Sequence, residues 1–181
     1  MATLIRNAQI ANDSWQRLEP VADGGLPAIP PQGDLLVSLK LWQSSSSALL
    51  GRAAGRVGVW LAPAEDPALI ADSLDALALV AVHFPQFADG RGYSTARLLR
   101  ERYGWKGELR AIGDVQRDQL FYLSRVGFDA FELNDGIDVP QEDLLRSARA
   151  ALSAFGDFSE AYQTSVERPL PLFRRRGAEV A

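Results

Sequence analysis

Apolar residues in this chain gather in five short runs, at 34–42, 56–61, 75–84, 108–112 and 129–133. Each run has the length of a β-strand, and the third (DALALVAVHF) is almost continuously apolar, which is typical of a strand buried on both faces. The runs alternate with helix-like stretches, and parallel strands joined in this way need right-handed crossovers. The pattern therefore predicts an α/β fold with about five mostly parallel strands. The short intervals leave two arrangements, an open three-layer sheet or a partial TIM-like barrel.

Capping residues mark the helices between these runs. Asp66 followed by Pro67 is typical of a helix start, and Asp114 is expected to cap a later helix. Gly104 and Gly127 follow helical stretches at positions where a left-handed residue commonly ends a helix. The predicted helices cover residues 44–52, 66–74, 93–103, 114–126 and 138–155.

The two ends of the chain differ in composition from the middle. In residues 1–33, alternating runs at 3–10 and 14–18 predict a hairpin or an edge ribbon, and the stretch rich in proline and glycine at 22–32 predicts an extended arm. Residues 34–158 are expected to form a single α/β domain, and residues 159–181 a mobile tail. The tail contains Arg174-Arg175-Arg176, either a solvated end or a docking peptide.

Composition excludes several kinds of chemistry. The 181 residues carry a net charge of −4, which gives no general attraction to nucleic acid or to anionic membranes. No stretch approaches the length of a membrane span, so we expect a cytoplasmic protein. The chain has no cysteine and one histidine, His83, which rules out iron–sulfur clusters and metal sites built on cysteine or several histidines. His83 follows an apolar run, and we interpret it as a structural residue at a strand end rather than a member of a catalytic triad.

A loop rich in glycine and arginine is the strongest candidate for a ligand site. Gly90 and Gly92 allow close approach of the backbone, and Ser94 lies where free N–H groups at a helix start point toward the loop. Arg91 and Arg97 add positive charge, so the loop could hold a sulfate, phosphate or carboxylate. The alternative is that the glycines only turn the chain and Ser94 only caps the helix. A dinucleotide-binding motif is a weaker match, because the third glycine of GxGxxG is missing.

Further polar residues fall near the same edge of the predicted sheet, since parallel sheets bind ligands at the carboxyl ends of their strands. Asp118 and Gln119 lie early in the helix that Asp114 is expected to cap, and Arg110 lies on the strand before it, so these three residues are further candidates for binding the ligand. Arg110 could instead be only an ion-pair partner for one of the aspartates. Asp89 and Asp114 are the candidates for a general base. The structural alternative is that the aspartates only complement the helix dipole.

Four segments around this loop resemble a bacterial family catalogued as domain of unknown function 934. The similar segments are Phe87–Arg100, Gly107–Val115, Asp118–Gln119 and Arg125–Asp129. The resemblance implies a link to assimilatory sulfite reduction, because members are commonly labelled as oxidoreductases of that pathway. It provides no catalytic residues.

We therefore expect an accessory or partner protein of assimilatory sulfite reduction, which binds a small anion and acts beside the sulfite reductase haemoprotein. Without cysteine, the chain is not expected to be the sirohaem reductase itself, nor to carry a metal, haem or iron–sulfur cluster. The alternatives are a stand-alone enzyme for a sulfur- or phosphate-bearing substrate, and a protein that binds flavin or nicotinamide non-covalently. The cofactor, the catalytic nature of the protein and its homo-oligomeric state stay open.

Overall fold

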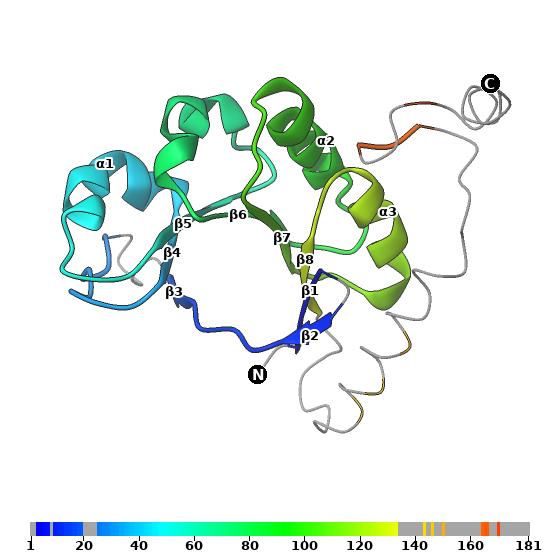
Figure 1. The fold of residues 1–181 in the computed structure, drawn as a ribbon, viewed down its shortest axis with the longest axis horizontal. Helices are drawn as coiled ribbons and strands as arrows, with labels where there is room; N and C mark the ends of the chain where they lie inside the picture. Colours follow the sequence, from blue (N-terminus) through cyan, green and yellow to red (C-terminus); the bar gives the residue numbers. More distant parts are fainter. Residues whose placement is uncertain are drawn as a thin grey trace, which may run out of the picture.

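The protein is built on one eight-stranded sheet (Figure 1). The computed structural model describes residues 3–7, 9–19, 25–133, 143, 146, 150, 164–166 and 170. The strands are β1 (Thr3–Arg6), β2 (Gln9–Ala11), β3 (Gln16–Leu18), β4 (Leu35–Ser38), β5 (Val57–Leu61), β6 (Leu79–Phe84), β7 (Glu108–Gly113) and β8 (Ala130–Leu133). Strands β3 to β8 lie side by side in sequence order and are all parallel. On the other side of β8, β1 pairs with it antiparallel, and β2 pairs antiparallel with β1.

The described helices lie on one face of this sheet, the outer face in Figure 1. They are α1 (Leu39–Leu50), η1 (Pro67–Ala76), α2 (Arg91–Arg97), η2 (Leu98–Arg102), η3 (Arg117–Gln119) and α3 (Leu120–Arg125). Since each strand from β3 onward pairs with the next one in the sequence, right-handed crossovers place every connection on the same side. The sheet is therefore curled like part of a barrel, and of the two predicted arrangements the partial barrel is the one formed.

The N-terminal segment shows how strongly the sheet is curled. Strands β2 and β3 are opposite edges of the sheet, yet only residues 12–15 join them. The five Cα steps from Ala11 to Gln16 reach at most about 18 Å, whereas eight strands laid flat would span about 34 Å. The two edges must therefore curve toward each other. In Figure 1 the segment crosses from β2 to β3 on the side opposite the helices.

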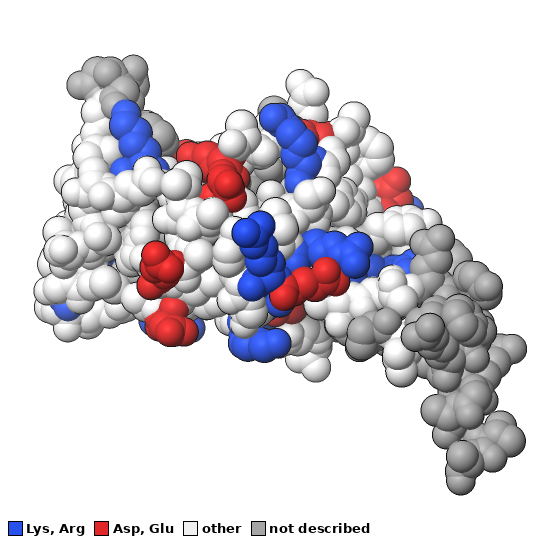
Figure 2. Space-filling model, turned by 90° about the horizontal axis from the view of Figure 1, so that it is seen from above, with Lys and Arg blue, Asp and Glu red and all other residues white. Residues whose placement is uncertain are grey.

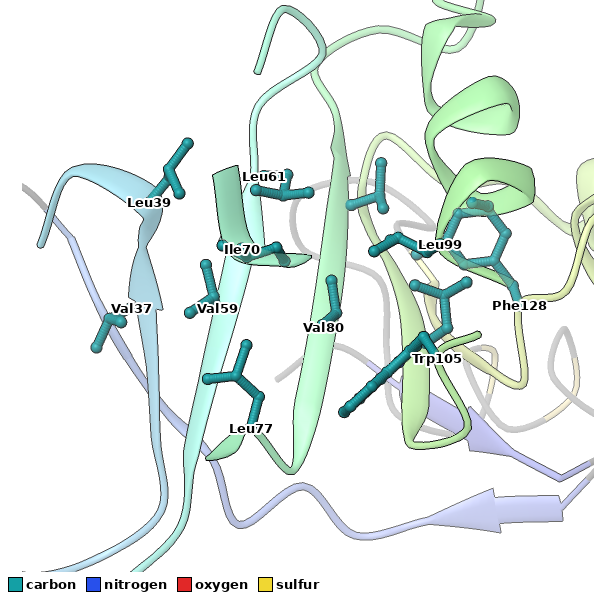
Figure 3. Close-up of a cluster of buried hydrophobic side chains, with 14 of the residues drawn as sticks. Val37, Leu39, Val59, Leu61, Ile70, Leu77, Val80, Leu99, Trp105 and Phe128 are labelled. Carbon is teal, nitrogen blue, oxygen red and sulfur yellow. The ribbon is translucent and has the colours of Figure 1, made fainter. Parts of the chain in front are cut away.

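Alternate residues of each strand separate into two apolar clusters. The larger one fills the space between the outer face and the helices, and Figure 3 shows part of it, with Val59 and Val80 from the strands against Ile70 and Leu99. The smaller cluster lies on the inner, concave face. It consists of Leu36, Leu79, Ala81 and Ile112, with Trp15 and Trp60 packed against it.

Five strands lie where the apolar runs predict them, but the first run is too long. Its strand ends at Ser38, whose Oγ accepts a hydrogen bond from the backbone N–H of Leu41 at 3.2 Å. This cap starts α1 at Leu39, so the last four residues of the run and the predicted helix 44–52 belong to one kinked helix.

Two other predictions about local structure are wrong. The run at 14–18 does not pair with the one at 3–10; it becomes β3 on the far edge of the sheet, while the hairpin forms between β1 and β2. Asp114 does not cap a helix. Gln116 does so instead, in a reciprocal pair of hydrogen bonds with Gln119.

The predicted helix ends at two glycines are confirmed: Gly104 (φ 67°) follows η2, and Gly127 (φ 109°) follows α3. The predicted helix at 138–155, the tail at 159–181 and its three arginines lie outside the described residues, apart from the isolated positions given above.

Candidate functional site

The predicted anion loop, residues 89–97, lies on the outer face, and we call this stretch the α2 loop. The helix starts at Arg91 and not at 93 as predicted, so most of the stretch belongs to α2 itself. Arg91 is bound to its neighbour Asp89, with 2.7 Å between Nη2 and Oδ2 and 3.0 Å between Nε and Oδ1. The Arg91 guanidinium lowers the pKa of the Asp89 carboxyl. Arg97 pairs with Glu101 at 2.8 Å, one helical turn further along. Both arginines that were expected to hold an anion therefore have a carboxylate partner close in the sequence.

The glycines of this loop have different surroundings. A Cβ at Gly92 would lie 2.5 Å from the ring of Phe84, so Gly92 lets α2 pack closely on β6. Gly90 has no heavy atom within 4 Å of the corresponding position, and Ser94 is exposed. Packing thus explains Gly92, and anion binding by this loop stays a prediction.

Asp114 and Gln119 together hold the backbone of the loop after β6. A carboxylate oxygen of Asp114 accepts a hydrogen bond from the N–H of Phe87 at 2.8 Å, and the Gln119 amide donates one to the Phe87 carbonyl at 3.0 Å. Asp118 is exposed nearby, and its charge adds to the burial that raises the pKa of Tyr93.

Arg110 is not part of this group, contrary to expectation. It lies on the inner face, fully buried, where Nη1 meets Asp13 at 2.8 Å and Nη2 meets Glu108 at 2.7 Å. Side chains alternate along β7, so Arg110 points away from the face that carries the helices. Glu108 also pairs with Arg6 at 2.8 Å. This cluster of charges ties the segment between β2 and β3 to the middle of the sheet.

A cavity of about 420 Å³ opens where β6, β7 and β8 end. We call it the strand-end pocket, and its polar lining comes from Arg17, His83, Asp114 and Glu132. A smaller cavity of about 70 Å³, here called the inner cavity, is lined by Arg17, Glu19, Trp60, His83 and Ile112. Arg17 and His83 line both cavities. The carboxyl ends of parallel strands are the usual ligand site of barrel-like α/β proteins.

His83 reaches this position because it is the next-to-last residue of β6, on the inner face with Leu79 and Ala81. Its ring packs edge-on against Trp60, with 5.9 Å between the ring centroids. It also lies over Gly113 (φ 97°), where a Cβ would come within 2.8 Å of the imidazole. Burial lowers the pKa of His83, and so does the charge of Arg17, while the carboxylates of Glu19 and Glu132 act in the opposite direction. The imidazole is therefore neutral near pH 7 and able to accept a proton.

Arg17 comes to the pocket from the opposite edge of the sheet, on β3. Its Nε lies 2.6 Å from Glu19, and its Nη1 lies 3.9 Å from Glu132 on β8. The side chains of Arg17 and Glu19 are 40% and 58% exposed, so their pair stays open to exchange with a ligand.

The sequence predicted part of this pocket: its place at the carboxyl ends of the strands, and Asp114, a candidate base, which lines it. The other polar residues of the lining were missed. His83 was interpreted as structural, and Arg17, Glu132 and Trp60 were not considered as site residues. One signal was available: His83 is the next-to-last residue of the apolar run 75–84, which puts it at the carboxyl end of a buried strand. Arg17 carried no comparable signal, because nothing local shows that residues 14–18 cross to the far edge.

Another cavity, of about 360 Å³, lies on the outer face among residues of α2, η2 and α3 and the segment 164–166. Its arginines are engaged by the protein, since Arg97 pairs with Glu101 and Arg125 donates a hydrogen bond to the carbonyl of Thr164 at 3.0 Å. Figure 2, seen from the side that carries α1 and α2, shows basic and acidic side chains mixed without a large patch of one sign. We therefore take the strand-end pocket as the candidate site.

Two further searches cover the described part of the chain. No group of three histidine, aspartate or glutamate side chains there is arranged to hold a metal ion. None of its helices is long and apolar enough to cross a bilayer.

Comparison with known proteins identifies the family of the chain. No curated protein matches the chain. A family model described as "Bacterial protein of unknown function (DUF934)" matches residues 58–173, well over half of the sequence. The match includes Trp60, His83, Asp114 and Glu132 of the two cavities, and Arg17 and Glu19 lie before it. This chain belongs to the DUF934 family of bacterial proteins of unknown function.

Proposed function

We propose that the strand-end pocket binds a small anionic molecule and that His83 exchanges a proton with it. The observation that carries this proposal is the meeting of the chain's single histidine with Arg17 in a cavity at the ends of three parallel strands. A volume of about 420 Å³ is within the range of small-molecule sites. A neutral histidine in such a cavity is a typical general base.

Arg17 has the role of anchor for the anionic group. Its present partner Glu19 is more than half exposed, and exposed ion pairs contribute only about 0–1 kcal/mol. An incoming anion can therefore take the place of the Glu19 carboxylate at small cost. Glu132 lies 3.9 Å from Arg17 across the pocket, so an incoming anion must also compete with this second carboxylate for the guanidinium.

Calorimetric titration with sulfite, sulfate and inorganic phosphate tests this assignment. We expect at least one of these anions to bind the wild-type chain, and Arg17→Gln to weaken that binding about tenfold or more. Arg91→Gln is the matched control, since it removes an arginine from the α2 loop instead. Loss of binding in Arg91→Gln alone would move the anion site to that loop, and absence of binding for all three anions would refute the proposal.

We also propose that the protein serves assimilatory sulfite reduction, either as a partner of the sulfite reductase haemoprotein or as an enzyme for an intermediate. The support is the family resemblance of the sequence, together with the small size and negative charge of sulfite, which suit the ligand proposed above. A deletion strain should then grow poorly on sulfite as sulfur source, and His83→Gln should restore growth less well than the wild-type gene. Normal growth of the deletion strain, with no co-purification of the haemoprotein, would remove this proposal.

The flavin or nicotinamide alternative has a simple test. A purified protein that is colourless and has no affinity for either dinucleotide would exclude it.

A further inference from the structure

Arg17 and Glu132 present opposite charges side by side in the strand-end pocket. We propose that this pair binds a compact zwitterion, a molecule whose acidic group and protonated amine are separated by one or two carbon atoms, such as an amino acid or an aminosulfonate. Arg17 binds the acidic group of this ligand, and Glu132 binds its ammonium group. The inference rests on the function proposed above and names the class of anion that the pocket selects.

The first argument is that Glu132 has an unused carboxylate. Glu132 lies on the inner face of β8, since its neighbours Phe131 and Leu133 belong to the larger apolar cluster on the outer face, and its side chain is only 24% exposed. In the described part of the chain the carboxylate accepts no hydrogen bond, because its one ion pair, with Arg17 at 3.9 Å, is too long to be one. A carboxylate that is largely removed from water needs such bonds. An ammonium group in the pocket would donate them.

The second argument is the distance between the two charges. Nη1 of Arg17 and Oε1 of Glu132 are 3.9 Å apart. Covalent bonds of about 1.5 Å put the amine and the acidic group of an amino acid or an aminosulfonate about 3–4 Å apart. Such a ligand can therefore place its acidic group on Arg17 and its ammonium group on Glu132 at the same time. A simple anion binds Arg17 alone and has to compete with Glu132 for it.

The third argument is the balance of charge in the strand-end pocket. Its lining has one positive side chain, Arg17, and two negative ones, Asp114 and Glu132. His83 is uncharged near pH 7 because burial lowers its pKa, so it does not repel an ammonium group. A ligand with only negative charge would meet an excess of carboxylates, whereas a zwitterion gives each of its charges a partner of opposite sign.

Calorimetric titration of the full chain with two pairs of ligands tests the inference. Taurine and isethionate share a sulfonate, and alanine and lactate share a carboxylate. Within each pair, a hydroxyl group replaces the ammonium group. We expect the wild type to bind taurine or alanine at least about fivefold more tightly than the matching hydroxyl compound, because only the ammonium compound has a charge for Glu132.

Substitution of the carboxylate tests its assignment. Glu132→Gln keeps the size of the side chain and removes its charge, so the preference for the ammonium compound should fall to less than about twofold. Glu101→Gln is the matched control, because it removes a carboxylate that also pairs with an arginine but lies on the outer face. This control should keep the full preference. A preference that is unchanged in Glu132→Gln would overturn the role of Glu132.

The outcomes separate this inference from the proposed function. If the wild type binds sulfite, sulfate, phosphate or isethionate but shows no preference for either ammonium compound, the zwitterion is wrong and the anion site stands. If it binds none of these ligands, both proposals are overturned. If it binds taurine or alanine but no inorganic anion, the zwitterion stands and a simple anion is excluded as the ligand.

Should Glu132→Gln fail to fold, nuclear magnetic resonance of the full ¹⁵N-labelled wild type decides, since it needs no substitution. The backbone amide signal of Glu132 should shift more on titration with taurine than with isethionate. Equal shifts with the two compounds would overturn the inference.

Discussion

The α2 loop and the strand-end pocket both contain arginines with a carboxylate partner close in the sequence, but only the pocket also brings together residues from distant strands. In the loop, Arg91 pairs with Asp89 two residues away, and Arg97 pairs with Glu101 four residues away. In the pocket, Arg17 also has a local partner, Glu19 two residues away at 2.6 Å, but it lies 3.9 Å from Glu132 on β8 as well, at the far end of the parallel strands. The pairs of the loop are all local, whereas the meeting of Arg17 with Glu132 and His83 depends on the curled sheet.

This difference bears on where chemistry can occur. Local, exposed pairs form in nearly any conformation of the loop and are screened by water. Groups brought together by the sheet lie in a cavity with partly buried walls, where a charge acts more strongly and a pKa can shift. His83 is the example, with a pKa lowered first by burial. Substitutions at residues joined by the sheet are therefore expected to have larger effects than substitutions at residues paired locally on the outer face.

The largest effect is expected from Arg110→Met, on the inner face. Arg110 is fully buried, and its removal leaves the carboxylates of Asp13 and Glu108 without their shared partner. Breaking a buried pair from one side costs about 3–5 kcal/mol, and the partial exposure of both carboxylates favours the lower end, about 3 kcal/mol. Denaturant unfolding at pH 7 measures this loss. Arg97→Met on the outer face is the control and should change the free energy of unfolding by less than about 0.5 kcal/mol. Equal losses of stability in the two variants would contradict the difference between the buried and the exposed ion pair.

An intermediate effect is expected from Gly113→Ala, at the floor of the strand-end pocket. The residue has φ 97°, and the new Cβ would lie 2.3 Å from the carbonyl oxygen of Phe84 and 2.8 Å from the ring of His83. Strain and overpacking together should cost about 2 kcal/mol and move the imidazole, so both unfolding and the His83 NMR signals should change. Gly90→Ala in the α2 loop has open space and φ −81°, and we expect it to stay within about 1 kcal/mol of the wild type. If the His83 NMR signals are unchanged in Gly113→Ala, Gly113 does not determine the position of the imidazole.

The same contrast explains what the sequence predicts well. Strands such as 56–61 and helix ends such as Gly104 depend on neighbouring residues, and these predictions are confirmed. The apolar runs also predict five of the eight strands and their parallel direction, but not that β1, β2 and β3 extend the same sheet.

The failures involve residues whose partners are distant in the sequence. The pattern at 14–18 predicts one arm of a hairpin. In the assembled sheet this segment is instead the edge strand β3, and Arg17 lies on it. Arg110 was assigned to nearby aspartates, but the alternation of β7 turns it inward to Asp13. His83 was seen but judged structural, because the residues that make its surroundings come from β3, β5, β7 and β8. The local sequence pattern does not predict contacts between residues that are so far apart in the chain.

A smaller effect is expected in the pH dependence of stability. Folding lowers the pKa of His83 below its usual 6.5, so the unfolded chain binds a proton more readily than the folded one. The contribution of the neutral imidazole is complete above about pH 6.5 and decreases as the pH falls from there through the lowered folded pKa. His83→Gln should remove this part of the pH dependence, measured as unfolding free energy between pH 7.5 and 5. A wild-type curve that is flat in this range, or a variant with the same slope, would contradict the neutral histidine.

The smallest effect is expected from Arg91→Gln in the α2 loop, and its absence is the informative result. Arg91 lowers the pKa of Asp89 below its usual 3.8, so the stabilisation by this pair is present above that pH and is lost as the pH falls through the lowered value. Because Arg91 is 60% exposed, we expect no measurable change in the denaturation midpoint at pH 7. At more acidic pH, the denaturation curves of the wild type and the variant should coincide. A clear loss of stability, or a loss of anion binding while Arg17→Gln binds normally, would mean that the loop has a role its local contacts do not explain. Unchanged stability together with unchanged binding leaves the chemistry with the residues that only the folded sheet brings together.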